Sequence, residues 1–176
     1  MAHSTPERGV LARYFAGVTE STFQTQLGVV DPPLVDYVSD LLCRFVHSDT
    51  IHRIRNLTGK RVASVAQMAV EANQRIGLAR RDVHRHIGDF TLFWTGLFPE
   101  ALERRQKTGD SFHDYCAQGK RAYLIAATIE TDEEQDAPGE LLERLGVNFE
   151  LCAYGLREVR REWEEEGDST NSLLLD

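Results

Sequence analysis

The chain has 176 residues, of which 41% are hydrophobic and 27% are charged, and its formal net charge is −8. A chain of this length buries about 70% of its unfolded surface, so we expect one domain with a substantial core. The negative charge argues against nucleic acid and against an anionic membrane surface as partners.

The first quarter of the chain predicts two long helices. We expect residues 1–8 to form a flexible tail and residues 9–27 to form a helix, although the Thr-rich second half of that segment is a poor helix former. Asp31 followed by Pro32 and Pro33 predicts an N-cap and a first turn, so a second helix should run to about His47. The core positions expected in these helices are Val10, Tyr14, Val18, Phe23, Leu34, Val38, Leu41, Leu42 and Phe45.

The next stretch predicts a short element, a turn and a third long helix. Residues 48–54 fit a short capped helix, and residues 50–54 alternatively fit an isolated strand. Residues 56–60 have turn composition. Residues 62–74 predict a helix that ends before Gly77. Its expected buried face contains Val62, Val65, Ala66, Ala69 and Val70.

The segment from Asp82 to Glu100 predicts the central helix, which Arg80 opens. Apolar residues recur along it at steps of three and four, and further apolar residues occupy its flanks. A helix that is apolar on most sides should be buried among other helices. The stripe consists of Val83, Ile87, Phe90, Trp94 and Leu97, with Leu92, Phe93 and Phe98 on the flanks.

The remainder predicts two further long helices and two mobile segments. After a short helix over 100–106, Asp110 or Ser111 should cap a helix that reaches Ile129 along a seam of small residues. Residues 131–139 predict a mobile acidic loop. An apolar seam from Leu142 to Trp163 predicts one continuous last helix across Gly146, and residues 167–176 a flexible tail.

These elements together predict a single all-α domain over residues 1–176, a bundle of about six to seven helices with the central and last two helices at its core. Charge is divided unevenly along it. Residues 52–85 carry eight Lys and Arg against Glu71 and Asp82, whereas residues 130–176 carry fifteen acids against four Arg. Either oppositely charged helices are solvated or lie near each other, or the basic segment is a docking surface for an anion.

Cysteine usage and hydropathy bear on the compartment. Cys43, Cys116 and Cys152 are an odd number without a close pair, and each lies on or beside an apolar stripe. We therefore expect small buried thiols in a reduced, cytoplasmic protein. The longest apolar window, 122–129, is too short to span a bilayer.

The strongest chemical signal is one face at the start of the central helix. Asp82, His86 and Asp89 follow one another by four and three, so their side chains share a face. His86 held by a carboxylate could act as a general base. Alternatively, Arg85 pairs with one of the acids and His86 is a polar residue at the edge of the core. Together with Tyr115 and Lys120, the three residues form our predicted ligand pocket for a small anion, and Arg121 on the same helix as Tyr115 could also line it; His84 should point elsewhere.

Metal binding is a further hypothesis. Asp49 with His52, and Asp110 with His113, repeat the Asp and His pairing at a spacing of three, as in carboxylate-bridged metal bundles. Both acids, however, lie where an N-cap is expected, and a capping carboxylate binds backbone N–H groups. We therefore expect no bound metal and no cofactor. The chain contains no phosphate-binding loop, dinucleotide loop, nucleophile elbow or zinc-binding spacing.

Three phrases of the chain carry a resemblance. They are His86-Ile87-Gly88-Asp89-Phe90, Gly96-Leu97-Phe98-Pro99-Glu100, and Asp114-Tyr115 with Gly119-Lys120-Arg121-Ala122-Tyr123. This part of the chain resembles uncharacterised bacterial all-helical proteins of no assigned activity. The resemblance covers mainly residues 80–130 and implies no cofactor or site residue.

Three functions follow as hypotheses. The first is a protein-interaction or regulatory module, of which a homo-oligomer formed through the last helix is one form, because the apolar seam of that helix is long. The second is a small-ligand or metal-binding bundle with a polar pocket around His86. The third is an enzyme that uses His86 as a general base. The catalytic residues are unknown from the sequence, and we expect neither membrane nor nucleic acid as a partner.

Overall fold

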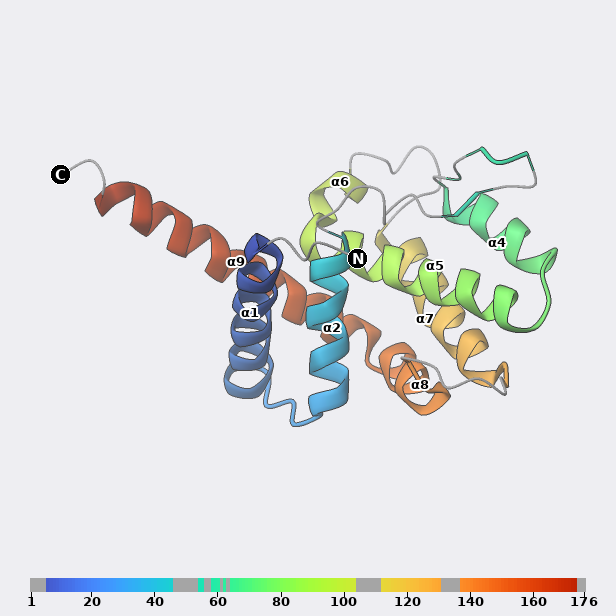
Figure 1. The fold of residues 1–176 in the computed structure, drawn as a ribbon, viewed down its shortest axis with the longest axis horizontal. Coiled ribbons are helices and arrows are strands. Elements are labelled where there is room, and N and C mark those ends of the chain that lie inside the picture. The colour runs from blue at the N-terminus through green and yellow to red at the C-terminus, as the bar shows by residue number, and fades with distance from the viewer. Residues whose placement is uncertain are drawn as a thin grey trace.

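A computed structural model describes residues 6–45, 54–55, 58–60, 62, 64–103, 112–130 and 137–173. The described residues form an array of eight α-helices and one π-helical turn (Figure 1), so the predicted all-α fold is confirmed. The elements are α1 (Pro6–Ser21), η1 (Thr22–Gln26), α2 (Pro32–Phe45), α4 (Val65–Asn73), α5 (Gly77–Leu97), α6 (Pro99–Glu103), α7 (Phe112–Thr128), α8 (Gly139–Val147) and α9 (Phe149–Leu173).

The first predicted helix buries part of its predicted face. Phe23 of η1 is buried as predicted, and Tyr14 and Val18 are partly buried against the core. Phe15, which was not predicted, is buried as α1 packs against α2 and α9, whereas Val10 is 65% exposed, so its assignment to the core was wrong. The Thr-rich end departs from α-helical geometry and forms η1, in which the Leu27 N–H donates to the carbonyl oxygen of Thr22 at 3.3 Å. Poor helix formers at the end of a helix allow such a wider turn.

Helix α2 begins as its sequence predicts. The Leu34 N–H donates to Asp31 Oδ1 at 3.3 Å, and two prolines follow the acid, so the helix start is capped and conformationally restricted. Its five predicted core residues are all buried: Leu34, Val38, Leu41, Leu42 and Phe45.

Helix α4 is shorter than predicted, and its buried face differs in part from the predicted one. It starts only at Val65, where the Ser64 side chain accepts a hydrogen bond from the Gln67 N–H. Met68 is fully buried against the neighbouring helices, whereas Val70 is 55% exposed. The predicted burial of Ala66 and Val70 was therefore wrong, because packing against α5 selects the face that contains Val65, Met68 and Ala72.

Helix α5 is the centre of the fold, as predicted, and starts at Gly77 rather than Arg80. It packs against α2, α4, α6, α7 and α9. A Cβ atom built on Gly88 would lie 2.6 Å from the Tyr123 ring, and one on Gly96 would lie 2.6 Å from Leu156. Glycine therefore lets α7 and α9 approach α5 closely.

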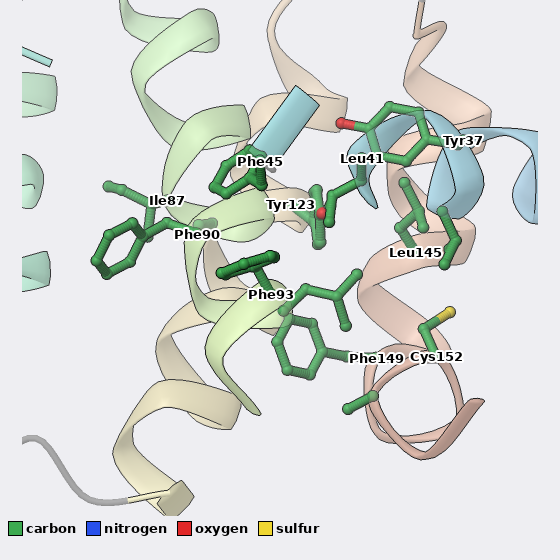
Figure 2. Close-up of a cluster of buried hydrophobic side chains, with 14 of the residues drawn as sticks. Tyr37, Leu41, Phe45, Ile87, Phe90, Phe93, Tyr123, Leu145, Phe149 and Cys152 are labelled. Carbon is green, nitrogen blue, oxygen red and sulfur yellow. The ribbon is translucent and has the colours of Figure 1, made fainter. Parts of the chain in front are cut away.

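An aromatic cluster fills the space beside α5 (Figure 2). The rings of Phe45 and Phe93 lie 5.2 Å apart, and those of Tyr123 and Phe149 lie 6.2 Å apart. The first contact joins α2 to α5 and the second joins α7 to α9, both through large buried side chains whose apolar burial stabilises the fold.

The predicted last helix is two helices. The chain turns at Asn148, whose φ of −100° and ψ of 24° end α8 and whose N–H donates to the Arg144 carbonyl oxygen. The apolar seam nevertheless stays buried on both sides of the break, from Leu142 to Val159, while Trp163 is 47% exposed and meets Phe15 edge-on. Helix α9 continues to Leu173 and projects beyond α1 (Figure 1), so residues 167–173 of the predicted flexible tail are helical.

Other predictions fall partly outside the described residues. These include the short element over 48–53, the helix end over 104–106 and most of the loop over 131–139. Cys116 and Cys152 are buried free thiols, and Cys43 is half-buried and free. In the part of the chain that the structure describes, no helix is both long enough and apolar enough to cross a membrane.

Candidate functional site

A cavity of about 330 Å³ lies between α4, α5 and α7. Helix α5 contributes Arg80, His84 and Ile87 at steps of four and three, which is one helical face. Helix α4 covers this face from one side and α7 from the other. The remaining lining residues are Val65, Ala69, Asn73, Gln118, Arg121, Ala122 and Ile125.

His84 is the residue that makes this cavity chemically distinctive. Its side chain is 6% exposed, and its Nε2 atom is buried without a hydrogen-bond partner among the described residues. Buried side-chain nitrogens are usually hydrogen-bonded in folded proteins, because an unmade bond costs free energy. His84 therefore lines the cavity and carries a buried hydrogen-bonding atom that has no partner in the described part of the chain.

The charges around His84 are positive. Burial lowers the pKa of His84 below its ordinary value of 6.5, and the guanidinium groups of Arg80 and Arg121 lower it further. The imidazole is therefore neutral at neutral pH and can donate or accept through Nε2. Arg80 also has a buried Nε atom without a partner in the described part of the chain.

The rest of the cavity combines an apolar wall with access to solvent. Val65, Ile87 and Ala122 are buried apolar residues of three different helices. Asn73 and Arg121 are exposed, so the cavity can be reached from outside. This arrangement can bind a small molecule that has a negatively charged group and an apolar part.

Asp89 lies on another face of α5 and has a full set of partners. It is 2% exposed, and its Oδ1 atom accepts hydrogen bonds from the hydroxyls of Tyr37 at 2.6 Å and Tyr123 at 2.7 Å. Its Oδ2 atom forms an ion pair with Arg44 at 3.0 Å. The network therefore ties α5 to α2 and α7.

Two arginines extend this network. The Arg85 Nε atom donates to the Tyr37 hydroxyl at 3.0 Å, and the guanidinium groups of Arg44 and Arg85 each lie 5.3 Å from the centre of the Tyr37 ring. Burial, and then the negative charge of Asp89, raise the pKa of both Tyr37 and Tyr123. Both hydroxyls therefore stay protonated and donate hydrogen bonds to Asp89, and the network stabilises the contacts of α5 with α2 and α7.

The predicted trio on α5 is divided among different surroundings. His86 is buried, and its ring stacks on Phe45 at 5.9 Å. Asp82 lines a second hollow of about 350 Å³ with Ile54, Val83 and three arginines, namely Arg55, Arg75 and Arg85. Arg85 thus lies between Asp82 and the Asp89 network, but the group to which it donates is the Tyr37 hydroxyl.

Of the three predicted pocket residues of α7, Arg121 lines the cavity beside His84, whereas Tyr115 and Lys120 lie elsewhere. Tyr115 is buried with its ring 6.2 Å from that of Phe90. The Lys120 Nζ atom forms an exposed ion pair with Glu150 at 2.9 Å. The structure therefore does not gather Tyr115 and Lys120 with Asp89 around one opening.

His84 was not among the predicted pocket residues, because its side chain was expected to point away from that of His86. One signal was nevertheless present: Arg80, His84 and Ile87 repeat the same four and three spacing as the trio that we selected. That spacing marks a shared face but does not reveal what covers it. Only the position of α4 shows that this face is enclosed.

Comparisons with protein families, with curated proteins and with solved structures found no match. The resemblance to bacterial helical proteins stays a prediction. Among the described residues, no three His, Cys, Asp or Glu side chains are placed to hold a metal ion together. Asp49, His52 and Asp110 lie outside the described residues.

Proposed function

We propose that this protein binds a small anionic molecule in the cavity between α4, α5 and α7. The observation that carries the proposal is the buried, unpartnered Nε2 atom of His84 beside the guanidinium group of Arg80. An unmade hydrogen bond of a buried polar group costs about 1–3 kcal/mol. A bound anion would offset that cost and would face two positive charges.

This proposal develops one of the sequence hypotheses and relocates it. A polar pocket was expected around His86, whereas His86 stacks on Phe45 and His84 lines the cavity. The general-base role of His86 remains a prediction. Binding is favoured over catalysis because the cavity supplies groups that hold a ligand, and its residues suggest no nucleophile paired with a base.

The proposal is tested by titrating the protein with acetate, inorganic phosphate and hexanoate at constant ionic strength. The imidazole ¹⁵N signals of His84 report directly on its partners. We expect at least one anion to shift these signals in a saturable way and to raise the melting temperature, because ligand binds the folded state alone. Arg121→Gln should weaken that binding about fivefold, the effect of roughly 1 kcal/mol for an exposed charge.

Arg13→Gln is the matched control, because Arg13 is an exposed arginine on α1. It should leave the titration unchanged. If no probe shifts the His84 signals at millimolar concentration, or if both arginine variants weaken binding equally, the cavity is not an anion site and the proposal is wrong.

A second candidate function is self-association through the last helix. Leu151 and Tyr154 are exposed on α9, Val147 is exposed at the end of α8, and Leu124 of α7 lies against Gly146. Neighbouring exposed apolar side chains favour contact with another chain, because burying them removes apolar surface from water.

A further inference from the structure

We infer that the anion is a small organic carboxylate with a hydrocarbon body. This inference rests on the proposed function and names the class of ligand. It follows from three features of the cavity, namely its size, the apolar part of its lining, and the source of its polar groups.

The size and lining of the cavity call for an organic ligand. Its volume is about 330 Å³, and pockets that hold organic ligands range from about 300 to 1,000 Å³. Half of its lining residues are apolar and come from all three helices: Val65 and Ala69, Ile87, and Ala122 and Ile125. An inorganic ion would leave this apolar wall without a partner.

Along α5 the two polar residues precede the apolar one, whereas Gln118 and Arg121 of the antiparallel α7 lie nearer the Ile87 end. Arg80 and His84 are one turn apart, and Ile87 follows one turn later. Seven residues of helix span about 10 Å, so a head group at Arg80 and His84 leaves room for a short chain that extends toward Ile87. Asn73 and Arg80 flank the short connection from α4 to α5, which places Asn73 at the polar end.

The polar groups suit a carboxylate better than a phosphate. Phosphate sites commonly use free backbone N–H groups at helix N-termini or glycine-rich loops. Here the polar side chains are those of Asn73, Arg80, His84, Gln118 and Arg121, the Arg80 N–H is bonded to the Ile76 carbonyl oxygen, and the lining contains no glycine; the helix start at the cavity is that of α4, where the apolar Val65 lies. A guanidinium fork and an imidazole N–H can bind the oxygens of either anion, so the lack of a glycine-rich loop and the bonded Arg80 N–H are what favour the carboxylate.

The experiment compares four probes through the His84 imidazole signals: acetate, hexanoate, hexyl phosphate and inorganic phosphate. Each buried CH₂ group strengthens binding about fourfold. We expect hexanoate to bind at least about tenfold more tightly than acetate, since the cavity is partly open and only some of its CH₂ groups would be buried. Hexanoate should also bind more tightly than hexyl phosphate.

Matched variants locate the hydrocarbon body. Ala69→Leu fills part of the apolar wall and should weaken hexanoate binding at least about fivefold with little effect on acetate. Ala66→Leu changes an exposed alanine of the same helix and should have no effect. If Ala69→Leu does not fold, Ile125→Ala removes part of the wall without added bulk and should lower the ratio of hexanoate to acetate affinity.

The outcomes separate this inference from the proposed function. If acetate or inorganic phosphate binds as tightly as hexanoate, the site binds anions but the hydrocarbon body is wrong. If hexyl phosphate binds more tightly than hexanoate, the carboxylate assignment is wrong. If none of the four probes shifts the His84 signals, the proposed function itself fails.

Discussion

Asp89 and His84 are two buried polar residues of the same helix with opposite degrees of hydrogen bonding. Asp89 accepts from two tyrosine hydroxyls and forms an ion pair with Arg44, whereas His84 Nε2 has no partner among the described residues. A carboxylate with both oxygens engaged stabilises its surroundings. An unpartnered imidazole nitrogen can instead still form a hydrogen bond with a ligand. These residues therefore predict different effects when they are changed.

At the residue scale, Asp89→Ala should destabilise the fold strongly. It removes the acceptor of the Tyr37 and Tyr123 hydroxyls and the carboxylate beside Arg44. We expect the free energy of unfolding to fall by about 3 kcal/mol, because buried groups are left unpaired while Arg44 is partly solvated. Urea unfolding measures this. Asp36→Ala, an exposed site on α2, should change stability by less than about 0.5 kcal/mol.

An equal loss in both aspartate variants would contradict the structural role that we assign to Asp89. Tyr123→Phe offers an intermediate case, since it removes one donor and leaves the ion pair intact. Its effect should be smaller than that of Asp89→Ala.

At the element scale, glycines decide how closely the helices around α5 approach it. Gly88 and Gly119 lie where α5 and α7 meet, and a Cβ atom on Gly119 would collide with Thr91 and Phe149. These two contacts, at Gly88 with Tyr123 and at Gly119 with Thr91, also show that α5 and α7 run antiparallel. Close approach positions the Tyr123 hydroxyl at Asp89 and brings α7 against the cavity wall.

Gly88→Ala should therefore destabilise the protein despite the better helix propensity of alanine. The added Cβ atom meets the Tyr123 ring at 2.6 Å, and this ring is buried and held by Asp89. We expect a net loss of about 1–3 kcal/mol in the free energy of unfolding, as for overpacked cores. Thermal or urea unfolding provides the measurement.

Gly17→Ala is the control for this substitution. Gly17 is in α1, and no heavy atom lies within 4 Å of a Cβ atom built there. It should stabilise the protein by about 0.5–1 kcal/mol through helix propensity alone. If Gly88→Ala were stabilising to the same extent, the close packing of α5 on α7 would be refuted.

At the scale of the whole molecule, we predict that two copies of the chain associate through α8 and α9. Static light scattering should give a molar mass that rises with concentration above the 19.9 kDa of one chain. Leu151→Glu should abolish that rise by placing a charge among the exposed apolar residues of α8 and α9. Val10→Glu, at an exposed apolar position on α1, should leave it unchanged.

A molar mass of one chain at every concentration would exclude self-association. The small-molecule proposal would then be unaffected, because the cavity is formed by α4, α5 and α7 within one chain. The two candidate functions can thus be judged independently.

The sequence by itself determined that the elements are helices and which of them lies at the centre of the fold. Asp31 and two prolines specified the start of α2, and apolar steps of three and four identified α5 as the buried helix. These signals are local, since a cap or a helical stripe depends on residues a few positions apart. The apolar stripe predicts burial correctly even where the limits of a helix were wrong. The stripe of α8 and α9 is buried although the chain turns at Asn148.

Tertiary structure decided which faces meet and what each polar residue contacts. Asp89 takes its partners from α2 and α7, and His84 is enclosed only because α4 and α7 cover its face of α5. The spacing of Asp82, His86 and Asp89 showed that they share a face of α5. A second set with the same spacing, Arg80, His84 and Ile87, is the one that lines the cavity. Helical periodicity specifies which side chains are neighbours on one helix. It carries no information about which distant helix lies against them.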